Sequence, residues 1–79
     1  MQLEKVMPLR DGRFSALWAP RDIEGLLLLK QPALNLPGKK GWSWLVLDDY
    51  LPNNVQMIRG QVFATRREAV QAIEMALSL

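Results

Sequence analysis

Basic and aromatic side chains are interleaved over residues 39–44 of this chain. Lys39 and Lys40 stand just before Trp42 and Trp44, which are two positions apart. Lysines neutralise phosphates and tryptophan rings stack on bases, so this pattern is typical of a surface that binds nucleic acid. The alternative is a solvated turn followed by two core tryptophans, because buried tryptophans dominate the cores of small domains.

Arginines extend this basic pattern at two other places. Arg13 follows a predicted tight turn, and Arg59 could gather with Arg66 and Arg67 near the end of the last predicted strand. Arg66 and Arg67 also stand at a predicted helix start, where free N–H groups favour an anion such as phosphate. A solvated arginine pair is the alternative there. The candidate nucleic-acid contacts are therefore Arg13, Lys39, Lys40, Trp42, Trp44, Arg59, Arg66 and Arg67.

The composition removes most catalytic chemistry. The chain has no Cys and no His, which excludes thiolate metal sites, disulfides and the commonest general base. Asp48 and Asp49 are adjacent, so on an extended strand they point to opposite sides and cannot jointly hold one ion. No Ser-Lys or paired-carboxylate spacing stands out. We expect no enzyme activity, no cofactor and no metal.

A length of 79 residues predicts a single domain over residues 1–79. The hydrophobic fraction of 49% is high for so small a core, which favours a homo-oligomer that buries the excess. A formal charge of +2 permits a polyanionic partner without demanding one. Residues 1–10 lack the apolar core of a signal peptide and the leucine run at 26–29 is too short to cross a bilayer, so we expect a cytoplasmic protein without membrane contact.

The first third of the chain predicts a β-hairpin. Residues 3–10 and 13–18 are short runs separated by Asp11-Gly12, a dipeptide that readily adopts the positive φ angles of a tight turn. Pro8 places the first strand at an edge of the sheet, because proline cannot donate to a neighbouring strand.

Residues 22–31 contain a run of four leucines that fits two structures. Acidic residues early in the segment, Lys30 late and Pro32 at its boundary favour a short helix. Gly25 and the short length favour a strand instead. We predict a short helix, although four leucines satisfy either period when both faces are buried.

Residues 41–50 form the clearest predicted strand. Apolar side chains occupy both of its faces: Trp42, Trp44 and Val46 on one, and Leu45 and Leu47 with Ser43 on the other. Such a strand is either central, with a helix above and a partner below, or carries an exposed aromatic face. After a turn at 48–54, residues 55–63 predict an antiparallel strand with a bulge at Gly60.

The end of the chain predicts a helix. Thr65 and Glu68 have the spacing of a capping box, in which the Thr65 side chain accepts from the Glu68 amide. Apolar residues then recur at helical spacing, and we expect Val70, Ile73 and Leu77 to dock on the sheet.

Residues 60–73 resemble the final strand and helix of small three-stranded DNA-binding modules. The resemblance is carried by Gly60, Phe63, Thr65, Glu68 and Ala69. It is similar to the arm-binding domains of phage integrases and to plant ethylene-response-factor domains; HicB-type antitoxins share a similar helix start. The resemblance to the first two implies a sheet face on DNA, with contacts from Arg13, Ser15, Lys40, Trp42, Trp44 and Arg59.

These elements predict an α+β fold: an antiparallel sheet of three to five strands, the C-terminal helix across one face and a short second helix near residues 22–31. We expect a non-catalytic module that binds nucleic acid through a basic and aromatic sheet face. The alternative is a protein–protein interaction module, such as an inhibitor, an antitoxin-like protein or a self-associating protein, that uses the same apolar face.

Overall fold

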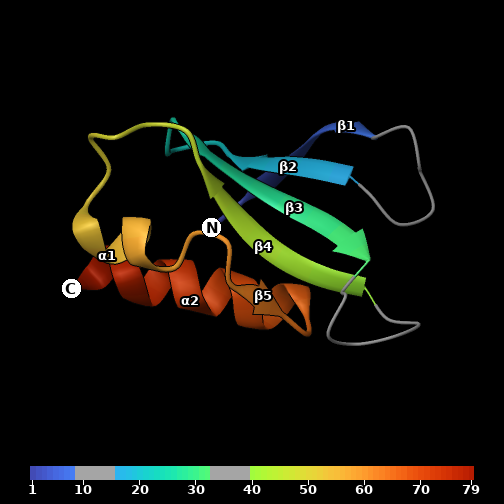
Figure 1. Cartoon of the computed structure of the whole chain (residues 1–79). Coiled ribbons are helices and arrows are strands. Elements are labelled where there is room, and N and C mark those ends of the chain that lie inside the picture. The colour runs from blue at the N-terminus through green and yellow to red at the C-terminus, as the bar shows by residue number, and fades with distance from the viewer. Residues whose placement is uncertain (9–15, 33–39) are drawn as a thin grey trace.

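The computed structural model describes residues 1–8, 16–32 and 40–79. The predicted turn at Asp11-Gly12, together with Arg13, Ser15 and Lys39, lies outside the described residues. The elements are β1 (Leu3–Pro8), β2 (Ala16–Pro20), β3 (Leu26–Pro32), β4 (Lys40–Val46), α1 (Asn53–Met57), β5 (Val62–Phe63) and α2 (Arg66–Ser78). The α+β fold predicted from the sequence is confirmed (Figure 1).

The five strands form one antiparallel sheet in the order β1-β2-β3-β4-β5, so each strand pairs with its neighbour in the chain. The predicted pairing of the first two strands is confirmed. β1 is an edge strand, as Pro8 indicated. The register of β1 against β2 shifts between Lys5 and Met7.

The leucine run forms the central strand β3 rather than the predicted helix. Leu26 and Leu28 are buried toward α2, and Leu27 and Leu29 point to the other side of the sheet. Gly25 shows why a strand forms here: its φ of +85° makes the preceding turn, and a Cβ added to it would lie 2.3 Å from Asp48 Cβ. This tertiary contact overrides the helix propensity of leucine.

Of the strand predicted over residues 55–63, only Val62–Phe63 forms as β5, which pairs antiparallel with β4 as expected; the earlier residues form α1 and a turn. Pro52 has a φ of −53° and precedes the short helix α1, as suits a residue whose ring fixes φ near the helical value. Val55 is fully buried in the core. Gly60, with a φ of +78°, lies in the turn before β5 rather than in a bulge, and its N–H donates to the Trp44 carbonyl at 3.2 Å.

Helix α2 begins where the capping box predicts it. Thr65 is the N-cap, and its Oγ1 accepts from the Glu68 N–H at 3.1 Å. Ile73 is fully buried with Ala69 and Ala76, while Val70 and Leu77 are half-buried. The prediction is confirmed for Ile73 and Leu77, which pack on the core together with Ala69 and Ala76; the half-buried Val70 is not among the described residues packed there.

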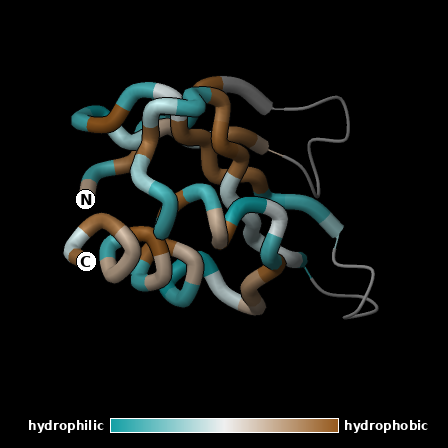
Figure 2. The backbone as a smooth tube through the Cα atoms, turned by 60° about the vertical axis from the view of Figure 1, so that its left-hand side comes forward, coloured by the Kyte–Doolittle hydropathy of each residue, from teal (hydrophilic) through white to brown (hydrophobic). Residues whose placement is uncertain are grey.

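Both helices lie on one side of the sheet (Figure 1). The core between the layers consists of Leu26, Leu28, Trp44, Val55, Ala69, Ile73 and Ala76. Figure 2 shows hydrophobic segments along the sheet and hydrophobic and hydrophilic segments alternating along α2. Neither helix of the described chain is long and apolar enough to cross a membrane.

The opposite side of the sheet is called the outer face below. Strand alternation and the pairing register place on it Leu17, Leu27, Leu29, Ser43 and Leu45. Within residues 1–8, 16–32 and 40–79, no helix packs on this face. Its leucines are half-buried, and Ser43 is buried and accepts a hydrogen bond from Gln31 Nε2 at 3.4 Å.

Candidate nucleic-acid interface

Trp18 on β2 and Trp42 on β4 meet across the central strand on the side of the sheet that carries α2. Their ring centroids are 5.3 Å apart and the ring planes are tilted by 45°. The register explains the contact, because Trp18 pairs with Leu28 and Trp42 with the next residue on that side of β3, Lys30. The two residues lie on strands separated by β3, so the contact is made by the indole rings reaching over the central strand. Both tryptophans are half-buried against the core.

Cations from three elements lie over these two rings. Lys5 Nζ is 6.0 Å from the Trp18 centroid and Arg66 Cζ is 5.7 Å from the same ring. Lys30 Nζ is 5.6 Å from the Trp42 centroid. These separations are within the range of cation–π attraction, which contributes about 0.5–1 kcal/mol per pair at an exposed site. The rings thus hold β1, β3 and the start of α2 in a common arrangement.

Lys40, the first residue of β4, completes the group. The pKa of Lys30 is lowered from its ordinary value, first by a side-chain hydrogen bond with Lys40, then by burial and by the charges of Lys40 and Lys5. Each of these effects disfavours the charged form of Lys30 relative to a lysine in water. The six residues, named the cation–indole cluster, are Lys5, Trp18, Lys30, Lys40, Trp42 and Arg66.

The positive charges of the cation–indole cluster are not neutralised by described carboxylates. The ion pairs within the described part of the chain join Arg21 to Glu4 and the amino terminus to Glu74 at 3.6 Å. Neither involves a cluster residue. The arrangement therefore concentrates like charges at one place on the surface, which favours an external anion.

Acidic residues gather at the other end of the sheet. The turn between β2 and β3 and the segment after β4 carry Asp22, Glu24, Asp48 and Asp49. These two segments are joined by a hydrogen bond of 2.7 Å from the Leu47 N–H to the Gly25 carbonyl. Lys30 and Lys40 lie toward the opposite ends of the same strands, away from these four carboxylates, while Arg21 and Arg59 lie at the acidic end.

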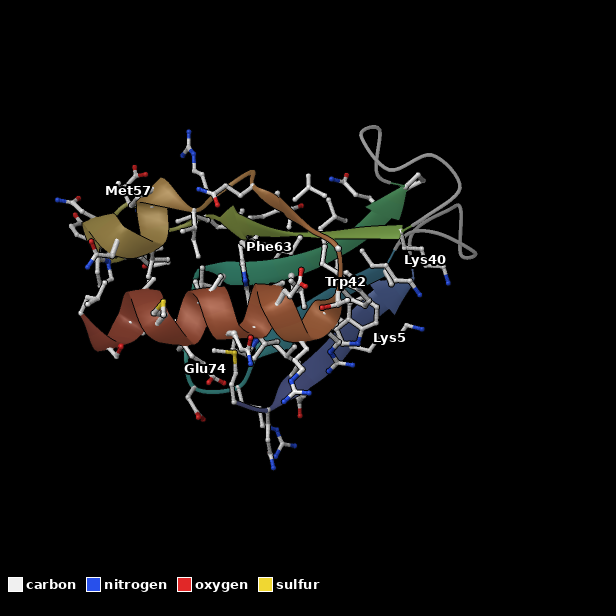
Figure 3. All side chains as sticks on the ribbon, turned by 90° about the horizontal axis from the view of Figure 1, so that it is seen from below. Lys5, Lys40, Trp42, Met57, Phe63 and Glu74 are labelled. Atoms are coloured by element: carbon white, nitrogen blue, oxygen red, sulfur yellow. The ribbon has the colours of Figure 1, made fainter. Side chains whose placement is uncertain are left out.

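Figure 3 shows Lys5, Lys40 and Trp42 together beside the N-terminal end of α2, with Glu74 farther along the helix. The structure thus brings together three of the predicted contacts, Lys40, Trp42 and Arg66. Arg67 is an exposed residue of the first turn of α2, and Arg59 is exposed in the turn after α1. Arg59 lines a hollow beside the Val46 end of β4, away from the cluster.

Trp44 has a different position from the one expected of a base-stacking residue. Its side chain is fully buried, and its indole N–H donates to the Ala69 carbonyl at 2.7 Å. Trp44 therefore belongs to the core, while Trp42 lies at the margin of the core. Trp42 and Trp44 therefore do not form one exposed aromatic face. Trp44 is a core tryptophan, which is the alternative that the sequence left open.

Sequence reasoning missed Lys5, Trp18 and Lys30. Trp18 alternates with Leu17 and shares a face with Ala16 in the second strand segment, which is the signal that could have linked it to Trp42. Lys30 was assigned to a helix end, where its partner across the sheet could not be identified. Lys5 carries no local signal, because only the β1–β2 register pairs it with Trp18.

The remaining surface offers little catalytic chemistry. An open groove of about 310 Å³ lies between the two helices, lined mainly by apolar side chains that include Met57, Ile58, Met75 and Leu79. Among the described residues, no group of three or more Asp or Glu side chains is placed to hold a metal ion. The cation–indole cluster is therefore the strongest candidate site.

Comparison of the chain with known protein families, with curated proteins and with solved structures finds no match.

Proposed function

We propose that this protein is a non-catalytic module that binds nucleic acid through the cation–indole cluster. One observation supports the proposal above the others: Lys5, Lys30 and Arg66 lie over a contacting pair of tryptophans, and Lys40 lies diagonally across from Lys30 on the same side of adjacent strands. Like charges held this close raise the free energy of the unbound protein. Phosphates would lower it by supplying the opposite charge.

A chain of phosphates suits this cluster better than one small anion. The four cations come from β1, β3, β4 and α2, and are spread over two rings whose centroids are 5.3 Å apart. A single phosphate would neutralise only some of them. Successive phosphates of one strand would reach several and release a counterion at each.

The test is a fluorescence titration with single-stranded and duplex 20-nucleotide DNA and RNA at several salt concentrations. We expect the logarithm of the association constant to fall linearly with the logarithm of salt concentration. Lys5→Gln or Lys40→Gln should flatten this slope by roughly 0.7–0.9 for each phosphate that the variant no longer neutralises. Arg59→Gln is the matched control, since it removes an equal charge from an exposed site away from the cluster.

Two results would contradict the proposal. One is the absence of binding to any of these oligonucleotides at tens of micromolar protein in low salt. The other is an equal change in slope for Arg59→Gln and Lys40→Gln, which would indicate general attraction to a basic protein. Far-ultraviolet circular dichroism of each variant checks that the fold is retained.

A second candidate function is self-association through the outer face. Its leucines, such as Leu27 and Leu45, pair side by side on a sheet surface with no described helix over it. Leu47 continues this surface with 65% of its side chain exposed. Sedimentation at micromolar concentration tests the candidate: a dimer that Leu27→Lys converts to a monomer supports it, and a monomeric wild-type protein contradicts it.

A further inference from the structure

Cations already lie over both indole rings of the cation–indole cluster. Trp18 has Lys5 Nζ at 6.0 Å and Arg66 Cζ at 5.7 Å from its centroid, and Trp42 has Lys30 Nζ at 5.6 Å. The two rings also contact each other. A base stacks only on a ring face that it can approach closely, so stacking here would require displacement of a cation.

The core and the paired strands also hold the two rings in place. Trp18 and Trp42 both pack against the buried core, and they belong to strands paired on both sides. Turning either ring outward to meet a base would leave a gap in well-packed surroundings. The side chains of Trp18 and Trp42 therefore keep fixed positions on the sheet.

The outward polar groups of the cluster are the ammonium groups of Lys5, Lys30 and Lys40 and the guanidinium of Arg66. Lysine ammonium groups suit phosphate oxygens as point charges. The cluster contains no amide or carboxylate side chain of the kind that distinguishes adenine or cytosine. Arginine and lysine can also bind a guanine edge, but Lys5, Lys30 and Arg66 come from three elements and lie over the two indole rings. This spread of charges favours the repeating phosphates over the edge of one base.

We infer that the cation–indole cluster binds the phosphodiester backbone, with Trp18 and Trp42 positioning the cations instead of stacking on bases. The inference rests on the nucleic-acid binding proposed above and specifies its ligand. Binding is then independent of base identity and of the presence of bases.

A direct comparison tests this with the unmodified protein. One ligand is a 20-nucleotide thymidine strand, and the other is a strand with the same number of phosphates and tetrahydrofuran in place of every nucleoside. If no base is stacked, both should bind with dissociation constants within about twofold and with equal salt slopes. Loss of even one stacked base would weaken binding of the abasic strand by roughly 5-fold to 150-fold.

The outcomes separate the two proposals. Equal binding of both strands supports the inference. Binding of the thymidine strand with a large loss for the abasic strand overturns the inference and leaves nucleic-acid binding intact. Failure of both strands to bind, together with failure of duplex DNA and of RNA, overturns both.

Variants of Trp42 provide a second measurement of its role. Trp42→Phe keeps an aromatic face under Lys30, so it should bind both strands nearly as the wild type does. Trp42→Leu removes that face and should weaken both strands by the same factor. A Trp42→Leu protein that loses affinity for the thymidine strand alone would show that the ring contacts a base, and this would overturn the inference.

Discussion

The indole N–H of Trp44 donates a hydrogen bond of 2.7 Å to the main-chain carbonyl of Ala69 in the first turn of α2. Trp44 is fully buried, and a buried indole N–H without a partner would destabilise the fold. The bond joins the middle of β4 to the helix, so it sets where α2 lies on the sheet. The position of Arg66, and hence of the cluster, depends on this placement.

Trp44→Ala should lower the free energy of unfolding by about 3–5 kcal/mol, because it leaves a large cavity beside α2. Tyr50→Ala is the matched control: Tyr50 is 97% exposed, and its loss should change stability by no more than about 0.5 kcal/mol. Urea denaturation of both variants provides the measurement. A Trp44→Ala protein as stable as Tyr50→Ala would show that β4 does not face the helix as described.

Thr65→Ala should destabilise the protein by about 1 kcal/mol through loss of the N-cap hydrogen bond to the Glu68 N–H. Thr65 is exposed, so reduced packing contributes little. Thr65→Ser keeps the hydroxyl and should retain most of the stability. Thermal melts followed at the helix signal distinguish the two, and equal melting of both variants would argue against the cap.

Gly25→Ala should be more damaging than Gly60→Ala, although both residues have a positive φ. At Gly60 nothing lies within 4 Å of an added Cβ, so the cost is about 1–2 kcal/mol of backbone strain. At Gly25 the same strain is joined by a contact of 2.3 Å with Asp48 Cβ. Denaturant melts measure the difference, and Asp48→Gly should restore part of the stability that Gly25→Ala removes. An equal cost at both glycines would refute the close approach.

The lowered pKa of Lys30 predicts a dependence of stability on pH. Between that lowered pKa and the ordinary value of 10.5, the folded protein binds fewer protons than the unfolded chain, so stability rises with pH there. Below this window the repulsion from Lys40 and Lys5 acts in full. Lys30→Met should therefore lack this rise with pH.

Denaturant melts of wild type and Lys30→Met at neutral and alkaline pH provide the measurement. The other lysines are present in both proteins, so the difference between the two profiles of stability against pH reports the contribution of Lys30. Nucleic-acid binding should restore the proton to Lys30, so affinity should fall as pH rises through the lowered pKa. Parallel pH profiles for the two proteins would contradict the described contact between Lys30 and Lys40.

Elements with local signals were predictable from the sequence. The start of α2 depends on Thr65 and Glu68, three residues apart, and its buried side on helical spacing. The β1–β2 pairing was predicted because the two segments are adjacent in the chain, with the sequence Asp11-Gly12 between them. In each case the deciding interaction joins residues that are near in the chain.

The elements predicted wrongly were decided by tertiary contacts. The leucine run has no period of its own, and Gly25 against Asp48 sets it as a strand. The candidate site divides in the same way. Lys40 and Trp42 were found because they are close in sequence, whereas Lys5 and Trp18 meet only through the register of two strands.

The order of the strands has a kinetic consequence. Because every strand pairs with the next one along the chain, β1 to β4 can pair by closing one loop at a time, whereas the pairing of β5 with β4 and the docking of α2 join more distant segments. The mixture of near and distant contacts gives an intermediate entropic barrier to folding. Refolding is accordingly expected on the order of milliseconds, within the range of small mixed α/β domains.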